Sequence, residues 1–141
     1  MSENLPSLAV FDFDGTLIKG DSFFPFLAHV AGGPRTFGNF IRALFLYARE
    51  KRRNADVELR TFVKSEMMAR LLAGVPKAKA ADASERMRIW RQWHEPMRQK
   101  LLDHHSQGHH IVIASGGLDL YLPEMLKDIP YHALICTQVE I

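Results

Sequence analysis

Apolar residues recur along the chain with two different periods. Three short apolar runs, each ended by a glycine or a polar residue, predict buried strands. These runs cover residues 8–13, 111–115 and 133–139. The interval between the first two runs instead carries apolar residues at i, i+3 and i+4 spacing, which is typical of amphipathic helices.

Three apolar stripes divide this helical interval. The first covers residues 37–48 and the second covers residues 59–71. The third extends from Pro76, a good first-turn residue, to Gly108, a stop signal, and Pro96 predicts a kink within it.

Strands that are separated by helical segments favour an α/β fold with a parallel sheet. About 100 residues separate the first two strands, far more than one crossover helix requires. We therefore predict a core formed by residues 1–20 and 106–141, with residues 21–105 as a helical insert. Ligand-binding residues are expected at the carboxyl ends of the strands.

Composition limits the number of domains and the kinds of partner. The chain has 141 residues, of which 47% are hydrophobic, enough for one core with an insert. Its 18 basic and 16 acidic residues leave a net charge of +2, too small an excess to indicate a nucleic-acid partner. The single cysteine, Cys136, excludes an internal disulfide and a cysteine-rich metal site.

The sequence shows no secretory or membrane-spanning signal. The N-terminal stretch MSENLPSLAVF lacks a basic segment followed by a long apolar one, and no apolar run approaches the length of a transmembrane helix. We therefore expect a soluble, cytoplasmic protein without a transmembrane segment.

Two carboxylates, Asp12 and Asp14, follow the first predicted strand. One carboxylate can attack phosphorus, while the other protonates the leaving oxygen and then deprotonates water. A turn at Gly15 can bring the two side chains together, and both are hard oxygen ligands suited to Mg²⁺. The simpler interpretation of a bare Asp-x-Asp is a turn or a helix cap.

The flanking residues favour the catalytic interpretation. The string VFDFDGTL, at residues 10–17, closely resembles the first motif of the haloacid dehalogenase-like phosphohydrolases. This resemblance implies that Asp12 is the nucleophile and Asp14 the general acid/base. It also implies that both residues bind the Mg²⁺ cofactor.

The second strand ends in Ser115-Gly116-Gly117, which supplies a hydroxyl and unobstructed backbone N–H groups. In its context the segment resembles the family's second motif, which implies that Ser115 and Gly116 bind phosphate. This motif and the helical insert are similar to the phosphoserine phosphatase-like branch, subfamily IB. That similarity implies a Rossmann-like three-layer core, with an incomplete parallel sheet, and a helical-bundle cap at residues 21–105.

Asp21 stands where phosphoserine phosphatases place a glutamate that meets the substrate, and capping of the next helix is an equally good interpretation. No residue stands out as the arginine that binds the carboxylate of phosphoserine. The stretch GDSFFPFLAHV, at residues 20–30, is similar to a broader bacterial set that includes phosphatidylglycerophosphate phosphatases. The resemblance thus implies a small phosphorylated substrate, with lipid phosphates among the candidates.

The family's third and fourth motifs, a lysine and a group of acidic residues, would lie beyond Ile141. We therefore expect a truncated chain with weak or absent turnover. The alternative is a non-catalytic relative that binds a phosphorylated ligand or a partner chain. The family's strand order would also leave the first strand at the sheet edge, which predicts a homodimer through that edge.

Residues 49–53, Arg-Glu-Lys-Arg-Arg, end the first helical stripe. The commoner meaning of such a run is a solvated helix end whose cations complement the helix dipole. Together with the preceding aromatic residues it also fits a helix that rests on a membrane surface. Both interpretations stay open at this stage.

Overall fold

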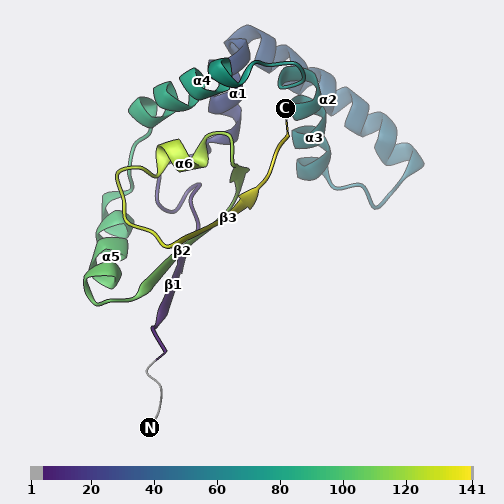
Figure 1. Cartoon of the computed structure of the whole chain (residues 1–141). Coiled ribbons are helices and arrows are strands. Elements are labelled where there is room, and N and C mark those ends of the chain that lie inside the picture. Colours follow the sequence, from purple (N-terminus) through teal and green to yellow (C-terminus); the bar gives the residue numbers. More distant parts are fainter. Residues whose placement is uncertain (1–4, 141) are drawn as a thin grey trace.

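The computed structural model describes residues 5–140 (Figure 1). Its elements, in chain order, are β1 (Leu8–Phe11), α1 (Phe23–Ala31), α2 (Gly33–Arg53), α3 (Leu59–Leu71), α4 (Lys77–Trp90), α5 (Glu95–Ser106), β2 (His110–Leu118), α6 (Leu122–Met125) and β3 (Ala133–Thr137). The three strands form one parallel sheet in the order β1-β2-β3. The predicted α/β, Rossmann-like fold is confirmed.

The sheet has one covered face and one open face. Phe11 and Ile113 are register partners on the covered face, where α5 packs: the Phe11 and His104 rings meet edge to face at 6.0 Å. On the open face Val10 and Ile135 are each 63% exposed. Helices therefore cover one side of the sheet within the described residues. The predicted edge position of β1 is confirmed, and pairing of two copies through that edge stays a prediction.

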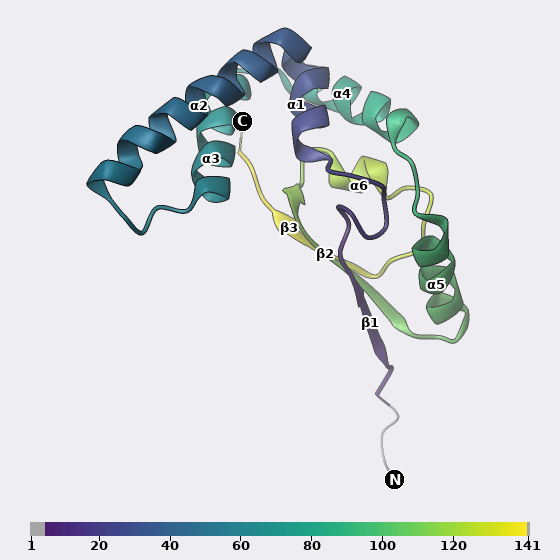
Figure 2. The ribbon, with the colours of Figure 1, turned by 180° about the vertical axis from the view of Figure 1, so that it is seen from behind.

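Helices α1, α2 and α3 form an arm that arches away from the sheet (Figures 1 and 2). The Phe24 and Phe40 rings pack edge to face at 5.5 Å, which joins α1 to α2. The rings of Tyr47 and Phe62 lie 5.9 Å apart, which joins α2 to α3. The sequence periodicity predicted α2 and α3 but not α1, whose nine residues are apolar almost all round.

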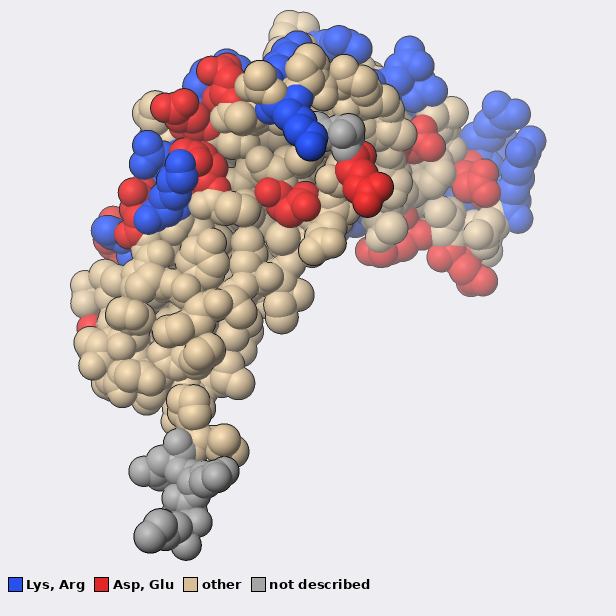
Figure 3. Space-filling model, in the orientation of Figure 1, with Lys and Arg blue, Asp and Glu red and all other residues tan. Residues whose placement is uncertain are grey.

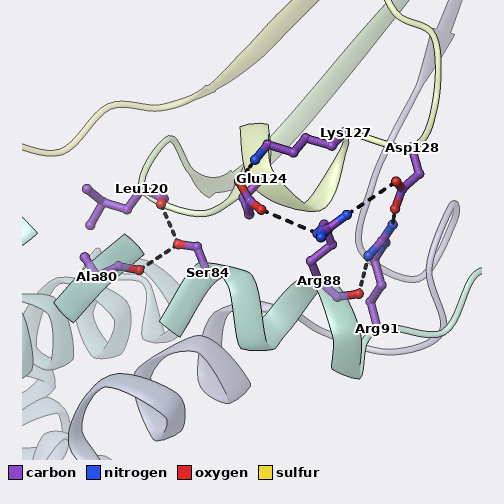
Figure 4. Close-up of polar contacts among 8 residues, drawn as sticks. All are labelled: Ala80, Ser84, Arg88, Arg91, Leu120, Glu124, Lys127 and Asp128. Atoms are coloured by element: carbon purple, nitrogen blue, oxygen red, sulfur yellow. Dashed lines mark hydrogen bonds and ion pairs between the residues drawn. The ribbon is translucent and has the colours of Figure 1, made fainter. Parts of the chain in front are cut away.

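Helix α4 is tied to the segment that follows β2 (Figure 4). The buried Ser84 hydroxyl donates at 2.8 Å to the carbonyl of Leu120. Beyond it, Arg88 lies 3.4 Å from a carboxylate oxygen of Glu124, and Arg91 pairs with Asp128. A helix of the insert is thus fixed to the core by a hydrogen bond from a buried serine and by a row of ion pairs.

The third predicted stripe is two helices rather than one kinked helix. Helix α4 ends at Trp90 and α5 begins at Glu95, with Pro96 in its first turn. Between them Trp93 forms an antiparallel bridge with Ile18. Residues 91–94 pair with the loop after β1 and therefore do not continue the helix. This pairing is a long-range interaction, so the local spacing of apolar residues could not predict it.

Helix α5 lies against the sheet, although the sequence analysis assigned its residues 95–105 to the insert. Leu101, at the centre of α5, is completely buried. In packing terms the arm that stands clear of the sheet consists of α1 to α3, and α4 bridges the arm and the core. The boundaries of a cap domain remain a prediction.

Candidate active site

The loop after β1 is built on a tight turn. Gly15 has a φ of 69°, in the left-handed region that favours glycine, and its N–H donates to the carbonyl of Gly20 at 2.9 Å. Phe13, Leu17 and Ile18 are completely buried beneath this turn. The apolar residues therefore anchor the loop that carries Asp12 and Asp14.

Backbone bonds fix the loop from the other side. The Lys19 N–H donates to the backbone carbonyl of Gln92 at 2.9 Å, and the His94 N–H donates to the backbone carbonyl of Leu17 at 2.8 Å. These bonds join the loop to the segment between α4 and α5. The position of the carboxylates is thus set by tertiary pairing as well as by the turn.

Asp12 and Asp14 both line one cleft at the carboxyl end of the sheet. Asp12 is exposed and accepts the Phe13 N–H at 2.7 Å through Oδ1. Its other oxygen has no protein donor among the described hydrogen bonds. One oxygen of Asp12 is therefore held in place and the other is available to a ligand.

Asp14 is half-buried and hydrogen-bonded. Its Oδ1 accepts both the hydroxyl of Ser22, at 2.6 Å, and the Ser22 N–H, at 3.1 Å. Burial raises the pKa of Asp14, and the Ser22 hydroxyl partly opposes that rise. The nearby Asp21 raises the pKa further and Lys64 lowers it. Asp14 is thus the carboxyl group of the pair that holds a proton more readily than an ordinary aspartate.

Behind Asp14 the polar contacts continue into the core. The Ser22 hydroxyl lies 2.8 Å from the phenol oxygen of Tyr121, and both side chains are completely buried. Burial raises the pKa of Tyr121, so its phenol stays protonated. Ser22 donates to the Asp14 carboxylate and the phenol donates to Ser22, which satisfies all three groups.

Ser115 and Gly116 reach the same cleft from β2. The Ser115 Oγ accepts the N–H of Gly117 at 3.0 Å. Because a hydroxyl carries one donor and two acceptor positions, this bond leaves the Ser115 hydrogen available to a ligand in the cleft. From β3, Thr137 also borders the cleft and donates its hydroxyl to the Gly116 carbonyl at 3.2 Å.

Helix α3 forms the opposite wall of the cleft, which has a volume of about 560 Å³. Its lining side chains are Arg60, Thr61, Lys64, Ser65 and Met68. Four of these five are polar, and they occupy two adjacent i, i+4 rows of the helix. The sequence analysis missed them, because any solvated face of an amphipathic helix shows the same pattern.

Two cations therefore face two carboxylates across the cleft. The Lys64 Nζ lies 4.8 Å from the centre of the Phe23 ring, a cation–π contact that places the ammonium beside the cleft. Within the part of the chain that the structure describes, neither Arg60 nor Lys64 has a carboxylate oxygen within 4.0 Å. Both are available to an anionic ligand.

Asp21 lies outside the lining of this cleft. Its Oδ2 accepts the Phe24 N–H at 3.2 Å, in the first turn of α1, which matches the capping interpretation. Asp21 also borders a smaller neighbouring cavity that shares Arg60 and Lys64 with the cleft. The structure thus brings together Asp12, Asp14, Ser115 and Gly116, with Asp21 one cavity away.

The carboxylates of Asp12 and Asp14 have the donor chemistry that Mg²⁺ prefers. Proteins usually hold this ion through one or two carboxylates, with water and substrate phosphate completing its shell. Within residues 5–140 no set of three or more histidine, cysteine or carboxylate side chains is arranged to enclose a metal ion. The two aspartates fit an ion that is shared with a phosphate.

Comparison with known proteins identifies the family of this chain. The family model described as haloacid dehalogenase-like hydrolase matches residues 9–141, which include both strand-end motifs. No curated protein sequence matched the chain. Among the described helices, none combines the length and apolar character that crossing a bilayer requires. Because the family match extends over nearly the whole sequence, the chain belongs to the haloacid dehalogenase-like hydrolases.

Proposed function

We propose that this protein is a Mg²⁺-dependent phosphomonoester phosphatase that acts through an aspartyl-phosphate on Asp12. The observation that carries the proposal is the convergence of Asp12, Asp14 and Ser115 in one cleft, opposite Arg60 and Lys64. A phosphate dianion in this cleft meets a nucleophile, a proton donor, a hydroxyl donor and two cations. This combination suits phosphoryl transfer, in which positioning and charge stabilisation dominate.

In the first step the outer oxygen of Asp12 attacks phosphorus. The bond between phosphorus and the ester oxygen breaks, and Asp14 delivers its proton to that oxygen, so that an alcohol leaves. The raised pKa of Asp14 favours this role, because a proton donor must hold its proton at the working pH.

In the second step Asp14, now a carboxylate, removes a proton from water. The water oxygen attacks phosphorus, the bond to Asp12 breaks, and inorganic phosphate is released. The Ser115 hydroxyl donates to a phosphoryl oxygen in both steps, because its own oxygen is already oriented by the Gly117 N–H.

Asp12 and Asp14 would hold the Mg²⁺ ion. When bound, this ion offsets the repulsion between carboxylate and phosphate and orients the transferred group. All other contributions to binding come from the chain itself, above all from Arg60 and Lys64.

Substrate choice is proposed to rest on the arm. The helical insert between the two motifs supports assignment to the phosphoserine phosphatase-like branch, subfamily IB, and supports the view that α1 to α3 act as a cap. Residues of α3 form the wall that a leaving group would contact, and Asp21 borders the adjoining cavity. A small phosphorylated compound fits a cleft of about 560 Å³.

The test is hydrolysis of p-nitrophenyl phosphate by the purified chain with Mg²⁺, compared with the Asp12→Asn variant. Asparagine keeps the shape and the acceptor for Phe13 but is a poor nucleophile, so we expect the turnover that the wild-type chain shows, weak as it should be, to fall to the uncatalysed rate. Asp82→Asn, on the exposed side of α4, is the matched control, because this aspartate lies outside the cleft lining and forms an ion pair with Arg86.

A second readout detects the intermediate independently of turnover. After incubation with substrate and acid quenching, mass spectrometry should find one added phosphoryl group on Asp12. A phosphoryl adduct on another residue, or turnover by Asp12→Asn equal to that of the wild type, contradicts the mechanism. Binding of inorganic phosphate without either turnover or adduct would support the non-catalytic alternative.

A further inference from the structure

The outer face of α2 carries an apolar stripe that no described segment covers. Phe37, Ile41 and Phe45 follow one another at i, i+4 and i+8, and they are 66%, 37% and 74% exposed. The opposite side of the helix contains its buried residues, Thr36 and Ala43. The stripe is therefore a second apolar face, on the side of α2 away from its buried residues.

The stripe continues into a strongly basic helix end. At about 100° per residue, Arg49 and Arg52 project within about 40° of the direction of Phe45, and both are exposed. Over its whole length α2 has six basic residues and one acidic residue, Glu50, which gives a net charge of +5. The basic residues are Arg35, Arg42, Arg49, Lys51, Arg52 and Arg53.

Figure 3 shows the same separation of charge on the surface. In this view most of the basic side chains on the arm lie along its outer rim, over α2, and most of its acidic side chains lie on the inner side of that rim. In a protein with a net charge of only +2, the excess positive charge is thus concentrated on one helix.

An apolar groove lies beside the stripe. It runs between α1 and α2, and its lining includes Phe24, Ala28, Phe37 and Phe40. Phe37 belongs both to this groove and to the exposed stripe. The apolar surface therefore extends sideways from the outer face of α2 toward α1.

We propose that the outer face of α2 binds the surface of an anionic membrane. In this arrangement α2 lies in the plane of the interface, Phe37, Ile41 and Phe45 enter the acyl boundary, and the cations contact lipid phosphates. The helix, with 21 residues, is about 31 Å long, so the stripe and the basic end contact the same leaflet. Charge complementarity selects this occupant, because an uncharged apolar partner would gain nothing from five excess positive charges.

The test is flotation of the full chain with vesicles, which does not depend on catalysis. We expect binding to phosphatidylcholine vesicles that contain about one-third phosphatidylglycerol, and much weaker binding to phosphatidylcholine alone. Salt at about 0.5 M should weaken the binding, since it screens the attraction between the cations and the lipid headgroups.

One double variant and two single variants test the two halves of the surface. Phe37→Gln with Phe45→Gln should lower the lipid partition coefficient at least tenfold. Arg49→Gln and Arg52→Gln should each lower it about fivefold. All four side chains are exposed, so circular dichroism should show folded proteins.

The open face of the sheet provides the matched control. Val10 and Ile135 are as exposed as Phe37, and Val10→Thr with Ile135→Thr should leave flotation unchanged. Loss of flotation in this control, or its retention in the Phe37 and Phe45 variant, overturns the proposal, as does failure of the wild type to float. Light scattering that shows a dimer, dissociated by Phe37→Gln with Phe45→Gln, would assign this face to a second copy and overturn it as well.

Discussion

The Ser22 hydroxyl lies 2.6 Å from Oδ1 of Asp14, and the Ser22 backbone N–H reaches the same oxygen at 3.1 Å. Ser22 lies eight residues after Asp14 and immediately before α1. The first helix of the arm therefore begins directly after the residue that holds the carboxyl group of Asp14. Tyr121, 2.8 Å from Ser22, extends this connection to the segment after β2.

Ser22→Ala should destabilise the protein. The substitution leaves the buried Tyr121 phenol without its partner and removes the stronger of the two Ser22 bonds to Asp14. A buried polar group left unsatisfied costs about 1–3 kcal/mol, so denaturant unfolding should show a decrease of this size. Tyr121→Phe should lower the free energy of unfolding by less, because the hydrogen bond from Ser22 to Asp14 remains. Equal stability of Ser22→Ala and the wild type would contradict the prediction.

Asp14→Asn should stabilise the protein at neutral pH while it abolishes turnover. The pKa of Asp14 is higher in the folded protein than the value of 3.8 that an unperturbed aspartate has. The protonated group therefore favours folding below that pH, and this contribution is lost as the pH rises through the raised pKa. Asparagine stays neutral at every pH, and its side-chain oxygen still accepts the hydrogen bonds from Ser22. The variant therefore does not lose this stability as the pH rises.

Urea unfolding from about pH 4 to about pH 8 measures this difference. The gain of Asp14→Asn over the wild type should grow as the pH rises through the raised pKa of Asp14, and partial solvent screening keeps this gain small. Asp128→Asn is a control of opposite sign, because its hydrogen bond with Arg91 lowers the pKa of Asp128. A gain for Asp14→Asn that does not vary with pH would contradict this explanation.

Arg60→Met and Lys64→Met should weaken substrate binding. Each substitution removes a cation from the wall of the cleft and keeps the aliphatic part of the side chain. A charged hydrogen bond contributes about 1.5–3 kcal/mol, so kcat/KM for a phosphate ester should fall about ten- to a hundredfold, mainly through KM.

Arg70→Met, an exposed position on the same helix and outside the cleft, is the control and should keep the wild-type kcat/KM. If the three variants lose activity equally, the effect comes from the net charge of α3 rather than from contacts in the cleft.

Gly117→Ala should destabilise the core beside the cleft residues Ser115 and Gly116. An added Cβ would lie 2.9 Å from the Tyr121 phenol oxygen and 3.0 Å from a methyl carbon of Leu122. Because Ser22 holds that phenol, the overlap should cost about 1–3 kcal/mol in unfolding experiments. Gly116→Ala meets nothing within 4 Å and should unfold at the same denaturant concentration as the wild type.

The local sequence was sufficient for the strand-end motifs. Three apolar runs, each ended by a glycine or a polar residue, predicted the strands of a parallel sheet. Because the strands are parallel and adjacent, Asp12 and Ser115 lie together at the carboxyl end of the sheet. This prediction succeeds because strand polarity and the side-chain period of a strand are local properties. The i, i+4 pattern located α2 and α3 for the same reason.

The sequence could not predict that α3 forms the wall of the cleft opposite the two motifs. Arg60 and Lys64 form part of the cleft only because the arm turns α3 toward the carboxyl end of the sheet. The break between α4 and α5 likewise depends on Ile18, which lies more than 70 residues from its partner Trp93. Such pairings are decided by long-range packing, which overrides local helical preference.

The sequence by itself therefore determined the fold class, the sheet polarity and four of the residues that line the cleft, which are Asp12, Asp14, Ser115 and Gly116. Only the tertiary structure decided which helix closes the cleft, that burial beside Ser22 raises the pKa of Asp14, and that the aromatic stripe of α2 remains exposed. The physical reason is that local patterns report the period and chemistry of a segment, whereas desolvation and proximity arise only when distant segments pack together.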